Sequence, residues 1–93
     1  MSTITITGNF NNSNNNTLSL DVFQFGTNGY NFHKRYQSSF TEVFDDLLPD
    51  NTYYIEITGS TTGTFDIKID GDIQNSISKS YSSFFMADFT IKS

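Results

Sequence analysis

The sequence predicts an all-β protein, folded as a single small antiparallel β-sandwich of seven or eight strands. Two observations lead to this class. Apolar and polar residues alternate with a period of two along most of the chain, which is the pattern of half-buried strands. Turn-forming segments separate these stretches at even spacing, as they do in sandwiches and closed barrels. A chain of 93 residues is expected to form one domain, residues 1–93.

The composition narrows the possible partners. Ten Phe and five Tyr can fill a dense core, and the absence of cysteine excludes disulfides and thiolate metal ligands. The net charge of −5 repels phosphate backbones and anionic lipids, so neither nucleic acid binding nor membrane insertion is expected.

The localisation is unknown from the sequence. Asn, Ser and Thr form more than a third of the chain, a composition common in surface and particle proteins. A codon bias accounts for that composition equally well. The stretch from Met1 to Thr5 has neither the basic nor the apolar region of an export signal, so no cleavable signal is expected.

Alternating stretches define the first strands. Ile4 and Ile6 alternate with threonines in a short strand, and the polar run 11–16 is expected to be an exposed loop. A turn is expected at Gly26–Gly29 on composition alone. Between the loop and the turn, a second strand is expected to bury three residues: Leu18, Leu20 and Val22.

The next two stretches, 30–37 and 40–47, are separated by only two serines. A hairpin between them would place Arg35 opposite Glu42, an attraction of roughly 0.2–1 kcal/mol. In this pairing Phe44 faces outward. Its inner face is expected to collect four residues: Tyr30, Phe32, Val43 and Leu47.

A second hairpin is predicted from the stretches 53–57 and 65–69, which flank the Gly-, Ser- and Thr-rich segment 59–63. A one-residue slip would move one apolar set to the wet face, so burial fixes the register. The expected buried pairs are Ile57 with Phe65, Ile55 with Ile67, and Tyr53 with Ile69.

The last strand is expected to run from Phe84 to Ile91. Its alternation directs Phe84 and Met86 outward. The inward set has four members: Phe85, Ala87, Phe89 and Ile91.

The segment from Leu47 to Ile57 resembles the corner between strands E and F of fibronectin type III domains, and prealbumin-like sandwich modules have a similar corner. The shared features are Leu47-x-Pro49 and a tyrosine, Tyr53, four residues after the proline. The resemblance implies an immunoglobulin-like or jelly-roll-like sandwich. It also implies a core position for the Tyr53 ring, with its hydroxyl bonded to nearby backbone. It covers 11 residues and implies no function.

The sequence offers few residues that could take part in catalysis. His33 is the only histidine, and nothing in the sequence places a nucleophile beside it, so it is expected to be a surface residue on a strand. One histidine without cysteine is also a poor basis for a zinc site. We therefore expect no enzyme activity, no catalytic residues and no cofactor.

One pair of carboxylates is a candidate calcium site. In the predicted second hairpin, Glu56 lies opposite Asp66, where two like charges repel. Lys68, diagonal to Glu56, is the simpler source of compensation. A bound Ca²⁺ is the alternative, although it needs six or more oxygen ligands and the sequence names few.

Aromatic and apolar residues on outer faces suggest a partner surface. The candidates are Phe84, Met86, Tyr54 and Phe44. They favour a binding module that self-associates, or binds another protein or a glycan, in a surface, particle or lectin-like role. Two alternatives stay open: a structural subunit of a fibre, coat or sheath, and a small acidic inhibitor or immunity protein.

Overall fold

The computed structural model of the chain describes residues 2–25 and 29–93, which form strands and connections without a helix. The predicted all-β class is therefore confirmed, and the turn predicted at Gly26–Gly29 lies largely outside the described residues. The six strands are β1 (Ser2–Phe10), β2 (Thr17–Phe23), β3 (Asn31–Tyr36), β4 (Phe40–Leu47), β5 (Thr52–Gly71) and β6 (Ile77–Lys92).

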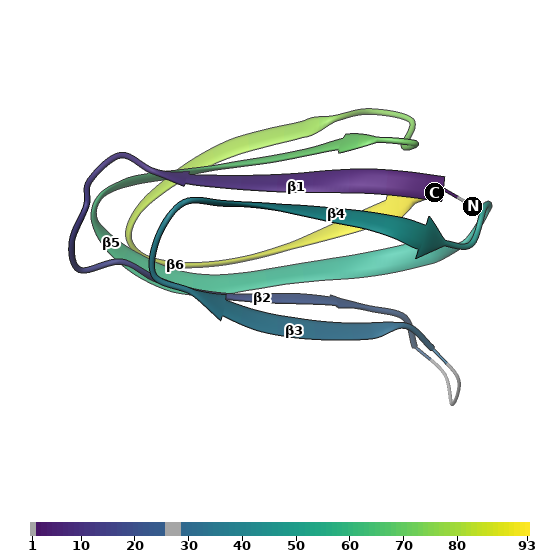
Figure 1. Cartoon of the computed structure of the whole chain (residues 1–93), viewed down its shortest axis with the longest axis horizontal. Coiled ribbons are helices and arrows are strands. Elements are labelled where there is room, and N and C mark those ends of the chain that lie inside the picture. The colour runs from purple at the N-terminus through teal and green to yellow at the C-terminus, as the bar shows by residue number, and fades with distance from the viewer. Residues whose placement is uncertain (1, 26–28) are drawn as a thin grey trace.

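The strands form one curled antiparallel sheet that is built around β5 (Figure 1). Along one edge of β5, residues 54–60 pair with β2 and residues 65–71 pair with β1. β3 extends the sheet beyond β2, and β4 extends it beyond β1. Along the other edge, β6 pairs with nearly the whole of β5. Each end of β5 therefore belongs to a different half of the sheet.

A bend divides β5 and β6 into two limbs each. The pairing between them shifts at Thr61–Thr64, where Thr61 lies opposite Ser83 and Thr64 opposite Ser82. The backbone of Ser83 has a φ of 58°, a left-handed conformation that few residues other than glycine adopt. We call residues 77–82 the first limb of β6 and residues 84–92 its terminal limb.

The Asn-rich loop 11–16 is tied to this bend by hydrogen bonds. The Thr61 hydroxyl lies 2.8 Å from Oδ1 of Asn16 and 3.0 Å from Oδ1 of Asn12, and accepts a bond from the Gly63 amide. The amide of Thr64 donates to Oδ1 of Asn11 at 2.7 Å. The loop thus satisfies polar groups where the strand ladder is interrupted.

The inner faces of both halves share one hydrophobic core. Every second residue of β1, β2 and β5 enters it, as the alternation predicts. Of the expected inward set of β6, Phe85 and Ile91 are buried, while Ala87 and Phe89 are half-buried. The fully buried set includes Ile4, Ile6, Leu18, Leu20, Val22, Tyr53, Ile55, Ile57, Phe65, Ile67 and Ile69.

The hairpin predicted between 53–57 and 65–69 is wrong. The chain does not turn at 60–62, because β5 continues through that segment, and both stretches pair with β6 instead. The two glycines of this segment allow neighbouring groups to approach the backbone closely and do not form a turn. A Cβ on Gly59 would lie 2.3 Å from the Thr17 carbonyl oxygen, and one on Gly63 would lie 2.2 Å from Oδ1 of Asn11. For this reason the described residues form six strands, of which β5 and β6 are long, where the sequence predicts seven or eight.

The pairing predicted between 30–37 and 40–47 is also wrong, because β3 pairs with β2 and β4 pairs with β1. The partner of β1 changes from Leu47 at Ser2 to Phe44 at Ile4, which is a register shift. This irregularity lets Phe44 and Leu47 both point inward, although they are three residues apart in the strand. Phe44 is 4% exposed and Val43 is exposed, the reverse of the prediction.

The corner that follows β4 has the bond expected of Tyr53. Its ring is buried, and its hydroxyl accepts a hydrogen bond from the backbone amide of Leu48 at 2.8 Å. The bond fixes the end of β4 to the start of β5.

The shared core gives a first testable prediction. Ile55→Ala and Ile67→Ala lie on different limbs of β5, and each should lower the free energy of unfolding by about 2–5 kcal/mol. Urea unfolding measures both losses. A loss below about 0.5 kcal/mol at either site would show that its limb does not contribute to the core.

The bend gives a second prediction. Thr61→Val keeps the side-chain shape but leaves the Asn16 oxygen and the Gly63 amide without this partner, so it should cost about 1–3 kcal/mol. Thr58→Val is the matched control, because Thr58 is exposed on the same strand. Its effect should stay within about 0.5 kcal/mol. Equal effects in urea unfolding would contradict a role for the loop in holding the bend.

Candidate functional site

The terminal limb of β6 carries the most exposed large apolar side chains on the strands. Phe84 is 88% exposed and Met86 is 78% exposed. They lie opposite Ser60 and Thr58 of β5, on the outer face, as the sequence predicts. Being two residues apart on one strand, they form a single apolar strip beside the edge of the sheet.

The outer face continues onto β5 and β2 as an aromatic cluster. Tyr54 lies opposite Phe23 of β2, with 5.7 Å between ring centroids, and the exposed Phe25 ring lies 4.7 Å from Tyr54. Tyr54 is half-buried rather than free. The predicted candidate Tyr54 therefore does lie on the outer face, but its ring is partly covered by these two phenylalanines.

Phe44 does not belong to this surface. Its ring points into the core, 4.9 Å from Phe32 and 6.3 Å from Tyr30 between centroids. These contacts join β4 to Phe32 of β3 and to Tyr30, which lies just before β3. The prediction of Phe44 as an outward interface residue is wrong because the register shift near Ser2 turns it inward.

A row of carboxylates crosses the same outer face. Asp21, Glu56 and Asp88 are successive cross-strand neighbours on β2, β5 and β6. At the end of the row, Nδ1 of the exposed His33 lies 2.6 Å from Oδ1 of Asp21. His33 is thus on a strand surface, as expected, with a carboxylate partner.

The predicted calcium pair is not brought together. Glu56 lies between Asp21 and Asp88, whereas Asp66 pairs with Asn9 and Ser80 on the other half of the sheet. The Ser80 hydroxyl donates a hydrogen bond to Asp66. Lys68 contacts Asp70 at 3.5 Å rather than Glu56. Among residues 2–25 and 29–93, no group of three or more His, Asp or Glu side chains is arranged to hold a metal ion.

Three strands have an edge without a strand partner in the described sheet: β3, β4 and β6. Inward-pointing charged residues occur on parts of these edges. Lys34 of β3 lies opposite the buried Leu20, and Glu42 of β4 lies opposite the buried Ile6. Lys79 of the first limb of β6 lies opposite the buried Ile67.

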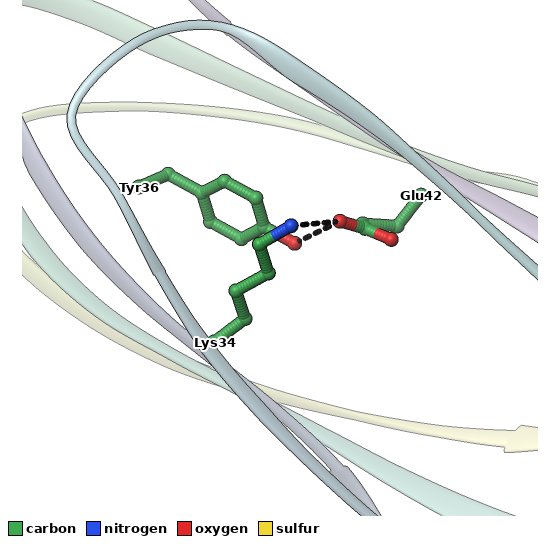
Figure 2. A network of polar contacts seen from close by, with 3 residues as sticks. All are labelled: Lys34, Tyr36 and Glu42. Carbon is green, nitrogen blue, oxygen red and sulfur yellow. Dashed lines mark hydrogen bonds and ion pairs between the residues drawn. The ribbon is translucent and has the colours of Figure 1, made fainter.

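The edges of β3 and β4 are joined by side chains, in what we call the seam (Figure 2). The Tyr36 hydroxyl donates to Oε1 of Glu42 at 2.7 Å, and Nζ of Lys34 lies 3.3 Å from the same oxygen. The rings of Tyr36 and Phe40 stack with centroids 3.8 Å apart. Glu42 thus bonds with Lys34 and Tyr36 instead of the predicted Arg35.

The seam and its surroundings change the acidity of two tyrosines. Burial, followed by the hydrogen bond to Glu42 and the charge of that carboxylate, raises the pKa of Tyr36 far above its ordinary value. Burial and the nearby Asp46 carboxylate raise the pKa of Tyr30 to about 12. Both tyrosines are therefore neutral hydrogen-bonding groups at physiological pH.

The hollows in the surface are shallow. One of about 540 Å³ lies at the bend, beside Phe84, and is lined by hydroxyl and amide side chains with Gly63. Another of about 390 Å³ lies between the β5–β6 connection and the end of β6, and includes Ile73 and Ile77. Neither hollow contains a histidine, and neither is lined by a pair of carboxylates.

Sequence reasoning found the strip of Phe84 and Met86 but missed the seam and the carboxylate row. Both depend on which strands are neighbours, which alternation alone does not reveal. The opposite charges of β3 and β4 were the available signal for the seam.

Comparison with known proteins gives no relationship: no family model, no curated protein and no solved structure matches the chain. Among the described residues there is no helix that is long and apolar enough to cross a membrane.

The seam gives a third prediction. The folded state holds the proton of Tyr36 more tightly than the unfolded state does, so the stability that this tyrosine contributes is present below pH 10 and falls as the pH rises above it. Tyr36→Phe removes that contribution. It should cost about 1–3 kcal/mol at pH 7 and make the alkaline loss of stability shallower.

Urea unfolding of both proteins between pH 8 and pH 11 measures this difference. Tyr30, whose pKa is also raised, is present in both proteins, so the comparison isolates Tyr36. Parallel curves would show that the hydroxyl of Tyr36 is not bound to Glu42 in solution.

Proposed function

We propose that the protein is a non-enzymatic binding module that self-associates through the outer face of the terminal limb of β6. The observation that carries this proposal is the strip of Phe84 and Met86, 88% and 78% exposed on the same face of a strand at the sheet edge. Large adjacent apolar side chains in water favour a contact that covers them.

The absence of a catalytic role is part of the proposal. His33 is exposed on a flat strand face, where its side-chain partner is the Asp21 carboxylate. General acid–base or nucleophilic chemistry requires converging groups and a site that excludes water. The two hollows described above are lined by neither a histidine nor a carboxylate, which favours binding over such chemistry.

The proposal includes a two-layer arrangement. Counting each limb of β5 and β6 as a strand gives two four-stranded layers around the shared core, in an eight-stranded sandwich. The pairing of β5 with β2 at one end and with β1 at the other supports it. In this arrangement the strip and the aromatic cluster of Phe23, Phe25 and Tyr54 lie on one outer face.

A second candidate is the small acidic inhibitor. The row of Asp21, Glu56 and Asp88 places three carboxylates side by side, where like charges oppose one another across the ladder. A basic protein surface would relieve that repulsion. Such binding weakens with salt, whereas an apolar contact persists, so ionic strength separates the two candidates.

Self-association gives the fourth prediction. The parent protein should have the mass of a discrete small oligomer at high micromolar concentration, because association covers the strip. Phe84→Ser combined with Met86→Ser should be monomeric under the same conditions. Light scattering after size exclusion, at several concentrations and at low and high salt, measures both.

The matched control is Val43→Ser with Leu48→Ser, since these residues are exposed apolar residues away from the strip. This variant should associate like the parent. A parent protein that is already monomeric at high micromolar concentration would contradict the proposal. Open-ended polymers would favour a structural subunit of a fibre or coat.

A further inference from the structure

The edge of β6 provides a means for a second copy to bind. β6 pairs only with β5 in the described sheet, so the backbone N–H and C=O groups along its other edge have no strand partner there. Such an edge is a template for another strand, and proteins blunt it with bulges, proline or inward-pointing charges. The free edges of β3, β4 and β6 differ in how many of these protective features they have.

The edges of β3 and β4 are unsuited to pairing with a copy of themselves. β3 contains Lys34 and Arg35 without an acidic residue, while β4 contains Glu42, Asp45 and Asp46 without a basic one. If either strand paired with the same strand of a second copy, like charges would face one another across the ladder. The first limb of β6 has an inward-pointing lysine, Lys79, of the kind that blocks edge pairing.

The terminal limb of β6 has none of these devices. Its charged residues, Asp88 and Lys92, are exposed on the outer face and cancel in sign. The inner positions from Phe85 to Ile91 are apolar, and the limb contains no proline. Of the free edges in the described part of the chain, it is the one that a neutral strand can approach without burying a charge.

We infer that two copies pair through their terminal limbs, edge to edge and antiparallel, so that one sheet continues across a twofold axis. This inference rests on the proposed self-association and specifies its geometry. The bend at Ser83 confines the ladder to the terminal limb, because the strand changes direction there. The same patch serves both copies, as a closed dimer requires.

The side chains of the limb complement a reversed copy of it. A pair centred on Asp88 is disfavoured, since it would oppose two carboxylates. A pair centred on Met86 gives a ladder of residues 84–88 in which Met86 lies opposite Met86 of the other copy. Each Phe84 then lies opposite the other copy's Asp88 and diagonal to its Met86. Phe84 and Met86 of the two limbs, the most exposed apolar residues there, would then form one continuous apolar row across the junction.

Hydrogen exchange tests this geometry. Backbone amides alternate in direction along an antiparallel strand, so every second amide of the paired residues 84–88 points away from β5. In a dimer these amides should exchange at least tenfold more slowly at high protein concentration than at low concentration. NMR on the parent protein, with light scattering at the same concentrations, resolves them individually.

The outcomes separate the inference from the proposed function. Association with slowed exchange at these alternate amides supports both. Association without it, or with new protection on β3 or β4 instead, overturns edge pairing and leaves self-association standing. A monomeric parent overturns both.

A substitution at the edge gives a second, independent test of edge pairing. Ala87→Lys gives the terminal limb an inward-pointing lysine like Lys79, and should weaken association at least tenfold. Ser78→Lys is the control, because it adds the same charge to the exposed outer face of the first limb and should leave association unchanged. Equal association constants for the two variants, both shown to be folded by circular dichroism, would overturn the inference.

Discussion

The bend of β5 at Thr61–Thr64 is the constraint on which the rest of the structure depends. One strand pairs with β2 before the bend and with β1 after it, so a single covalent connection places both halves of the sheet around one core. The ladder between β5 and β6 is interrupted at this bend, and side chains of the Asn-rich loop 11–16 bond to Thr61 and Thr64 there. Every buried side-chain nitrogen and oxygen among the described residues has a partner.

Curling the sheet brings β3 and β4 close without joining their backbones. The gap is bridged by the seam, in which Glu42 accepts bonds from Lys34 and Tyr36 while Tyr36 stacks on Phe40. The same charges that bridge the gap also make each edge repel a copy of itself. Internal closure and resistance to edge pairing therefore come from the same residues on this side of the molecule, whereas the terminal limb of β6 has no equivalent.

The layout of the outer face supports the proposed binding role. The charged and aromatic residues of the outer face lie in flat rows across neighbouring strands, as Asp21, Glu56 and Asp88 do. Flat rows expose functional groups to water, where charges are screened, instead of converging them on a reacting atom. A partner surface can contact such rows along their length.

The order of residues along the chain is enough to locate most of the extended segments and their buried faces. Alternation depends only on each strand having one wet and one dry side, so Ile4, Leu20 and Ile67 were placed correctly without knowing their neighbours. The pairing of the strands, in contrast, became known from the folded structure alone. The glycines near Thr61 have the composition of a turn yet serve a continuous strand, and one register shift reversed Phe44 and Val43. These features arise from contacts between segments distant in the chain, such as the loop 11–16 against β5, which local periodicity does not encode.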